Sequence, residues 1–451
     1  MSPNRQSTDL AGPSLIELQR IQSQLQKQLD EHNPGETLSW AVPAQPQEIP
    51  AHTLATIEAA GPAMHSFFAA ANAIFRDEPW VRPLVEKRYH LNYRRLNDAQ
   101  PTALPWCPRP DIVPDAEWNP KFVELEITVG GRSDGTMMSR AYGLPEETTT
   151  VYQYVEMLRR RGLAEQPVVL ISAFHPAYEE LGNDARCFAS LCREAGANVV
   201  ALVDEDLPYL SYRDGRLRYL RPGAAFEFSH FDRFIDIFEI AEVAHAGMRP
   251  LLDAYLDGVA TDLNTCKQFL DEKLWMALFW DLRLETTWRR HIGVEHYELL
   301  RKILPFTTFL SADTKIRLQG EWLPIDRLRE LPDRERTFVT KESGTSETAA
   351  AAQSFVVLSE MSGSDVEAHL QTLIESGPPS IIQELVESVK IDFTAIDPET
   401  NTRLHQEQAR VKMSAFYVDG RLGDLLLIAS NKQYAVHNDG YMETVVSRSG
   451  R

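Results

Sequence analysis

Residues 121–131 read Lys-Phe-Val-Glu-Leu-Glu-Ile-Thr-Val-Gly-Gly, and this stretch decides the fold that the sequence predicts. Its apolar side chains favour a β-strand, and Glu124, Glu126 and Thr128 recur at every second position, on one face. Upstream lies Arg109-Pro110-Asp111, which we interpret as the partner strand. Three carboxylates and one arginine therefore fall on a predicted strand pair, and the two glycines allow a sharp turn after it.

Glutamates that share one face of a strand repel each other. A divalent cation between them removes this repulsion, and hard cations such as Mg²⁺ prefer oxygen ligands. A solvent-facing strand of a half-buried hairpin explains the same alternation, because exposed strands often carry glutamate at every second position. The residues alone leave both interpretations open.

The pattern Arg109-x-Asp111, followed by Glu124-x-Glu126 before a glycine turn, resembles the metal-binding signature of circularly permuted ATP-grasp ligases, the glutathionylspermidine synthetase-like group. Asn usually stands in this group where the chain has Glu126, which changes the charge but keeps an oxygen ligand. The resemblance implies that Asp111, Glu124 and Glu126 bind Mg²⁺. It also implies that Arg109 orients a metal ligand or an acyl phosphate.

The C-terminal third resembles the same group in the expected order. Leu304-Pro305-Phe306-Thr307 is similar to the entry into the grasp domain, and Lys315 follows as a first nucleotide lysine. The strand 336–341 would bring Lys341 to the ATP phosphates, and the small-residue loop 343–346 follows it. Segment 380–387 resembles the strand and hinge that read adenine, which implies nucleotide contacts from Gln383, Glu384 and Val386.

Residues 409–421 predict a β-hairpin with Asp419-Gly420 at its turn. Arg410 and Lys412 share one face of its first strand, although such a basic pair is also common on exposed strands. By resemblance, Arg410 stabilises the transferring phosphoryl group and Lys412 binds the nucleotide. The agreement of several segments in order carries more weight than any one of them.

Composition sets further limits. A chain of 451 residues predicts two or three structural units that share a cleft. The net charge of −19 disfavours nucleic acid and anionic membrane as partners. We expect no membrane span and no signal peptide, because no apolar stretch is long enough and the N-terminus lacks an apolar core. The four cysteines, Cys107, Cys187, Cys192 and Cys266, show no metal-ligand spacing. We expect Cys187 and Cys192, which fall in one predicted helix, to be buried and reduced, and we expect a cytoplasmic location.

The expected fold class is α+β or α/β, an ATP-grasp fold with permuted element order and a βαβ pre-grasp domain. Residues 1–50 would form a disordered tail and an amphipathic helix over 14–30, and residues 51–160 a helical segment with the acidic strands. Residues 161–300 would form the α/β pre-grasp unit, with strands at 167–172 and 198–203, a helix at 183–195 and a long helical run at 267–290. Residues 301–451 would form the nucleotide-binding lobes.

The resemblance implies an enzyme that joins a small-molecule carboxylate to an amine in a biosynthetic reaction, using ATP and Mg²⁺ and releasing ADP and phosphate. An acyl phosphate would be the intermediate, so no protein nucleophile is needed. Two other classes stay open. One is an ATP-grasp kinase that phosphorylates a hydroxyl, and the other is a noncatalytic nucleotide-binding protein. Assembly into a homo-oligomer is also left open.

Overall fold

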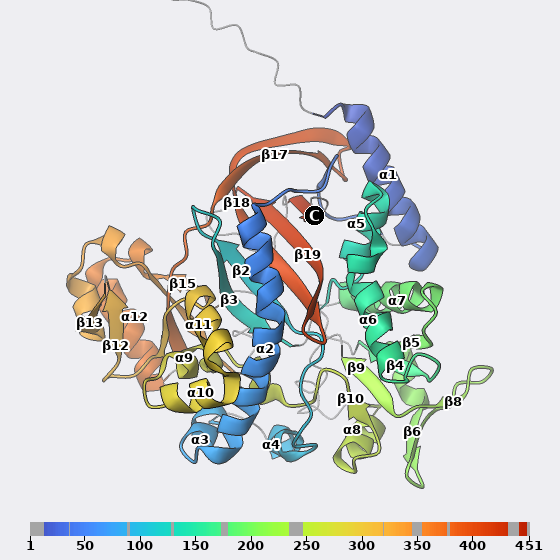
Figure 1. The fold of residues 1–451 in the computed structure, drawn as a ribbon, viewed down its shortest axis with the longest axis horizontal. Coiled ribbons are helices and arrows are strands. Elements are labelled where there is room, and N and C mark those ends of the chain that lie inside the picture. The colour runs from blue at the N-terminus through green and yellow to red at the C-terminus, as the bar shows by residue number, and fades with distance from the viewer. Residues whose placement is uncertain are drawn as a thin grey trace, which may run out of the picture.

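The computed structural model describes residues 13–35, 37–87, 91–127, 130–172, 179–233, 247–318, 320–344, 354–376, 379–431 and 442–448. The predicted disordered tail up to residue 12, Thr128, and the loop residues Thr345 and Ser346 lie outside these ranges. Within them the chain is a mixed α and β structure with three main sheets (Figure 1).

The largest sheet is antiparallel and lies at the centre of the molecule (Figure 1). The strand β18 (Thr402–Val418) organises it, because it pairs with β17 (Lys390–Asp397), β19 (Arg421–Ser430) and β2 (Arg109–Pro114). The edges are β3 (Pro120–Glu126) beside β2, β20 (Met442–Val445) beside β19, and β1 (Val42–Pro43) beside β17. Both predicted strand pairs, β2–β3 and β18–β19, are confirmed.

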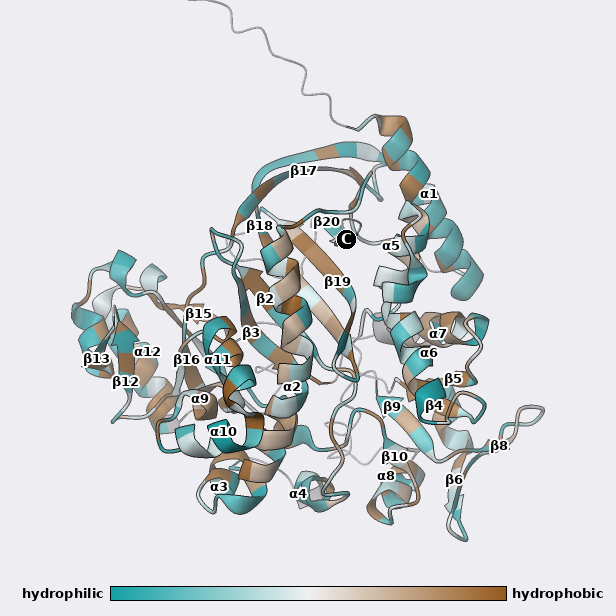
Figure 2. Cartoon of the chain, in the orientation of Figure 1, coloured by the Kyte–Doolittle hydropathy of each residue, from teal (hydrophilic) through white to brown (hydrophobic). Residues whose placement is uncertain are grey.

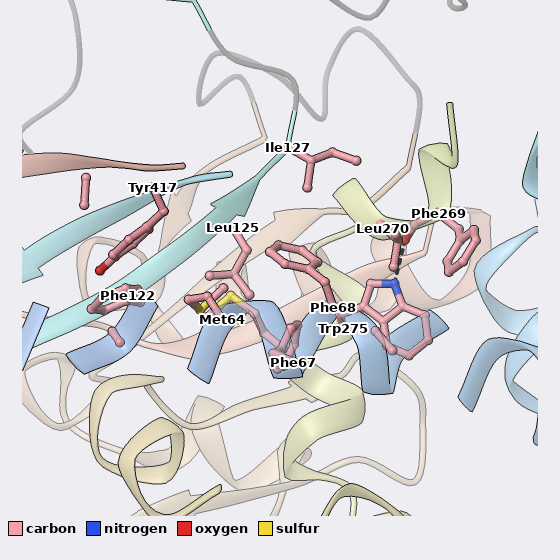
Figure 3. Packing of buried hydrophobic residues seen from close by; sticks show 14 of the residues in the cluster. Met64, Phe67, Phe68, Phe122, Leu125, Ile127, Phe269, Leu270, Trp275 and Tyr417 are labelled. Carbon is pink, nitrogen blue, oxygen red and sulfur yellow. Dashed lines mark hydrogen bonds between the residues drawn. The ribbon is translucent and has the colours of Figure 1, made fainter. Parts of the chain in front are cut away.

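The two faces of this sheet differ in chemistry, because neighbouring residues along a strand point to opposite sides. One face packs its apolar side chains against the long helix α2 (Ala51–Asp77), as Figure 3 shows for Phe122, Leu125 and Tyr417 beside Met64 and Phe67. The opposite face carries polar and charged side chains between β3 and β20 and is partly covered by α5 (Asp134–Tyr142) and α6 (Thr150–Arg160). The predicted strand glutamates lie on this polar face.

Helix α2 touches the β18–β19 turn at Gly61. A Cβ atom at Gly61 would lie 2.3 Å from the Gly420 carbonyl oxygen, closer than real contacts allow. Alanine inside a helix normally stabilises by about 1 kcal/mol relative to glycine. We expect Gly61→Ala to destabilise the protein instead, by roughly 1–3 kcal/mol, because backbone must shift. Denaturant unfolding measures this, with the exposed Ala55→Gly change in the same helix as a propensity control; a stabilised Gly61→Ala variant would contradict the close packing.

The second sheet is parallel, with the order β10 (Thr261–Asp262), β9 (His230–Arg233), β4 (Val168–Ile171), β5 (Val199–Leu202). Helix α7 (Glu179–Glu194) connects β4 to β5, which confirms the predicted βαβ unit. A three-stranded hairpin sheet of β6 (Leu210–Arg213), β7 (Arg216–Tyr219) and β8 (Phe226–Glu227) extends from it (Figure 1).

A third, antiparallel sheet forms a lobe on the other side of α2 (Figure 1). Its order is β11 (Thr307–Phe309), β16 (Ser380–Glu384), β14 (Phe338–Glu342), β15 (Val356–Val357). The helix α12 (Gly363–Ser376) and the hairpin of β12 (Lys315–Leu318) and β13 (Glu321–Pro324) complete the lobe around a small apolar core that includes Phe338, Val366 and Ile382.

The prediction of one long helix over residues 267–290 is wrong. This segment forms a 3₁₀ turn, η4 (Gln268–Asp271), and two helices, α9 (Leu274–Trp280) and α10 (Glu285–Ile292). The Asp281 side chain accepts the Arg283 backbone N–H at 2.9 Å, a local bond that competes with helix continuation. Two further helices follow α2 in the chain, α3 (Val81–Val85) and α4 (Leu91–Asp98).

The remaining elements cover the sheets. Helix α1 (Leu15–His32) begins at a capping box between Ser14 and Glu17 and packs on α5 and α7 of the same chain. Figure 2 shows its outward side as largely hydrophilic. The other helices are α8 (Arg249–Leu256), α11 (Val294–Ile303), η1 (Glu146–Thr148), η2 (Asp204–Tyr209), η5 (Ile325–Glu330), η6 (Asp333–Glu335) and η8 (Leu358–Glu360).

Cys187 and Cys192 are buried, as predicted, and so are Cys107 and Cys266. None of the helices in the described part of the chain combines the length and the apolar character that crossing a membrane requires.

Candidate active site

The register of β2 and β3 brings the predicted arginine and carboxylates together. Asp111 lies opposite Glu124, and Arg109 lies opposite Glu126, so all four side chains share the polar face of the large sheet. The Arg109 guanidinium forms an ion pair with Glu126, and its Nε atom lies 4.0 Å from Asp111 Oδ1. The predicted carboxylates therefore form one cluster.

The neighbouring strand β18 adds a lysine and a serine to this cluster. Lys412 Nζ donates to Asp111 Oδ2 at 2.8 Å, and Ser414 Oγ donates to Asp111 Oδ1 at 3.0 Å. The side chains of Lys412 and Asp111 are only 10% and 11% exposed, so water screens this ion pair little. Arg410 is two residues away on the same strand, in register with Ser430.

The small lobe contributes Lys341, which lies on β14 as the sequence predicts. Its Nζ donates to the Val123 carbonyl oxygen of β3 and to Gln383 Oε1, each at 3.0 Å. Gln383 Nε2 in turn donates to Thr307 Oγ1 at 3.1 Å. Burial lowers the pKa of Lys341 to about 8. This lysine therefore lies between the sheet of the small lobe and the large sheet.

Sequence reasoning missed Lys273, which precedes α9. Its Nζ lies 2.7 Å from Glu124 Oε1, and burial alone would raise the pKa of Glu124. Lys273 and Lys341 outweigh burial and hold this pKa below its ordinary value. Sequence reasoning overlooked Lys273 because it placed this residue inside one long amphipathic helix, where a lysine is normally a solvent-exposed charge.

Glu443 on β20 was also missed. Glu443 lies opposite Ile428 of β19, and Ile428 lies opposite Lys412 of β18 on its other side. Glu443 is only 4% exposed. Burial raises the pKa of Glu443 to about 7, against the opposing charges of Lys412 and Arg109. Only the fold brings β20 to this face, and the local sequence Met442-Glu443-Thr444-Val445 resembles any short strand.

The donor chemistry of the cluster suits Mg²⁺. Burial raises the pKa of Glu126 to about 7, and the nearby charges of Asp111 and Glu124 add to this effect against Arg109. A divalent cation relieves such repulsion, and carboxylate oxygens are ligands that Mg²⁺ takes. In the described ranges, however, His, Cys, Asp and Glu side chains nowhere form a ready metal-binding group of three or more. Basic side chains engage the three carboxylates, so binding requires these ion pairs to rearrange.

Three other predicted nucleotide residues lie at the edges of the small lobe. Lys315 is exposed on the hairpin β12–β13, at the far side of the lobe from β2 and β3 (Figure 1). Glu384 is exposed at the end of β16, and Val386 is half-buried just after it. Their nucleotide contacts stay predictions.

The raised pKa of Glu443 has a measurable consequence for stability. This carboxyl holds its proton up to about pH 7 when folded and loses it near its ordinary pKa when unfolded. The unfolded state therefore binds fewer protons between about pH 4.5 and 7, so this group lowers stability as the pH rises through that window. We expect Glu443→Gln to stabilise the ligand-free protein by roughly 1–3 kcal/mol at pH 8 and little at pH 4.5. Denaturant unfolding at both pH values checks this, and an equal effect at both would contradict the buried, protonated carboxyl.

No protein-family model matches the chain, and no curated protein matches it. Among solved structures, a glutathione synthetase-like effector from Globodera pallida, in its apo form, aligns with a TM-score of 0.57 and 12% identity, over 91% of this chain and 90% of that chain. A protein described as "Putative gamma-glutamylcysteine synthetase" from Methylobacillus flagellatus KT aligns with a TM-score of 0.40 and 11% identity, over 88% and 87% of the two chains. The first likeness shows a shared fold, and the second is too low to add to it.

Proposed function

We propose that this protein is an ATP-dependent carboxylate–amine ligase of the ATP-grasp type with permuted element order. One observation carries the proposal: four basic side chains and four carboxylates, from two sheets and the residue before α9, gather on one sheet face. The basic residues are Arg109, Lys273, Lys341 and Lys412, and the acidic ones are Asp111, Glu124, Glu126 and Glu443. The fold shared with the glutathione synthetase-like effector supports the same class.

The basic side chains would bind the nucleotide and stabilise the transferring group. Lys341 and Lys412 would bind the ATP phosphates, because both are buried cations. Lys341 lies at the junction of the small lobe and the large sheet, and Lys412 lies within the large sheet beside Asp111. Arg109 would orient the substrate carboxylate and stabilise the charge of the transferring phosphoryl group, together with Arg410. The fold brings these cations to one site, and their ion pairs with the carboxylates must rearrange when Mg²⁺ and substrate bind.

Asp111, Glu124 and Glu126 would hold Mg²⁺, which offsets phosphate charge during phosphoryl transfer when it is bound. In exchange, Lys273 and Arg109 would pass from carboxylates to phosphate or acyl oxygens. Transfer of the γ-phosphoryl group to a substrate carboxylate breaks the bond between this group and ADP and forms an acyl phosphate. Attack by the amine then forms the amide and releases phosphate and a proton.

The proposal is tested by measuring ADP and phosphate release from MgATP with pooled amino acids and small peptides, leaving out one pool at a time. Release that needs both a carboxylate and an amine component supports the ligase. A phosphorylated product without any need for amine would show a kinase instead. MgATP binding without release, once carboxylate and amine pools have been varied widely, would favour a noncatalytic nucleotide-binding protein.

A further inference from the structure

The turn that follows β3 is tied to the active-site arginine. Arg109 uses one side of its guanidinium for Glu126, and its Nη1 donates to the Gly130 carbonyl oxygen at 3.2 Å. The position of this carbonyl therefore helps to fix the arginine. Contacts that hold the turn 130–133 in place therefore help to hold Arg109.

The α/β unit holds this turn by accepting hydrogen bonds from the backbone of the turn. Asp184 of α7 accepts the N–H groups of Gly131 at 2.7 Å, Arg132 at 3.2 Å and Ser133 at 3.1 Å. The Ser133 hydroxyl also donates to Asp184. Three successive amide groups directed at one carboxylate form a concave anion-binding turn, which here holds a side chain of the protein itself.

The side chain of Arg132 makes a second and deeper attachment. Its Nη1 donates to Asp232 Oδ2 at 2.6 Å, its Nη2 donates to the Arg233 carbonyl oxygen at 3.3 Å, and both charged side chains are fully buried. Asp232 lies at the carboxyl end of β9, beside β4. The chain passes from β4 to β5 on one side of β4 and later returns to β9 on its other side. Open parallel sheets place functional groups at such a reversal of strand order.

Burying two charges is costly, and apolar side chains of similar volume often stabilise a protein as well or better. A buried ion pair does, however, fix the orientation of its side chains, because a planar guanidinium binds carboxylate and carbonyl partners in few geometries. We propose that Arg132 is a positioning residue, which through Asp232 locks the turn 130–133 to the parallel sheet and so sets the place of Arg109. Only the effect of Arg132 on nucleotide binding rests on the proposed function.

The chain offers a matched control in the same sheet. Arg233 and Asp262 form another fully buried ion pair at 2.6 Å, but the Arg233 side chain reaches the Thr265 carbonyl oxygen and not the turn. Asp232→Asn and Asp262→Asn make the same chemical change to two similar pairs. Both variants should therefore lose thermal stability, whether or not Arg132 positions the turn.

Hydrogen exchange of the Gly131, Arg132 and Ser133 amides separates positioning from general stability, in conditions where each variant is folded. We expect about tenfold faster exchange in Asp232→Asn and no comparable change in Asp262→Asn. MgATP affinity, measured by calorimetry, should fall about tenfold in Asp232→Asn alone. If Asp232→Asn does not fold, Arg132→Lys keeps the charge but loses the second contact, and the same results are expected.

Equal exchange in the two aspartate variants, or an unchanged turn in Asp232→Asn, would overturn the positioning role. The exchange measurement uses no nucleotide. If the unmodified protein failed to bind MgATP, the proposed function would fail, and the exchange result would still decide the role of Arg132.

Discussion

Glu124→Gln should reduce MgATP turnover by roughly 100-fold or more and leave the protein folded. Glutamine keeps the size of the side chain but removes the charge that pairs with Lys273 at 2.7 Å and that we assign to Mg²⁺. The Lys273 side chain, which loses its partner, is 15% exposed, so its charge keeps some contact with water. The measurement is substrate-dependent ADP release across a series of Mg²⁺ concentrations.

Glu117→Gln is the matched control, because Glu117 is exposed in the turn of the same β2–β3 hairpin. It should leave both turnover and Mg²⁺ dependence unchanged. Turnover of Glu124→Gln with an unaltered Mg²⁺ dependence would show that the metal assignment is wrong. Circular dichroism and thermal unfolding of both variants separate a loss of chemistry from a loss of fold.

The parts of the site that the sequence predicted share a physical basis. The β2–β3 and β18–β19 pairs are local hairpins, so alternation and the Asp419-Gly420 turn are enough to specify which side chains share a face. These patterns place Asp111, Glu124 and Lys412 on their strands, and the resemblance to circularly permuted ATP-grasp ligases singled them out as site residues. Cross-strand pairing then fixes their mutual approach.

The missed residues depend on contacts between distant segments. Lys273 pairs with Glu124 because the predicted long helix is interrupted before α9. At this interruption the Asp271 side chain accepts the Ile127 backbone N–H, a contact between segments that are distant in the sequence. Glu443 reaches the cluster because β20 pairs with β19 at the sheet edge. Helix periodicity and strand alternation describe local geometry only, so neither reports which distant element will supply a partner.

Lys341→Met should weaken MgATP binding by about 10- to 100-fold, because a buried cation is lost at the junction of the small lobe and β3. Methionine has a similar length and is apolar, so it fills the space without a new polar group. Calorimetry of MgATP binding measures the change. The control is Lys390→Met, which removes an exposed lysine from β17 and should leave the affinity unchanged.

The same lysine predicts the direction in which MgATP affinity changes with pH. Burial holds the pKa of Lys341 at about 8 without ligand, so this amine is about half protonated at pH 8. Phosphate oxygens beside it favour the charged form and raise the pKa, so binding at pH 8 should take up as much as about half a proton at Lys341. The affinity should therefore fall as the pH rises from about 8 toward 10. Calorimetry in buffers of different ionisation enthalpy measures this uptake, and an uptake that persisted in Lys341→Met would assign the proton to another group.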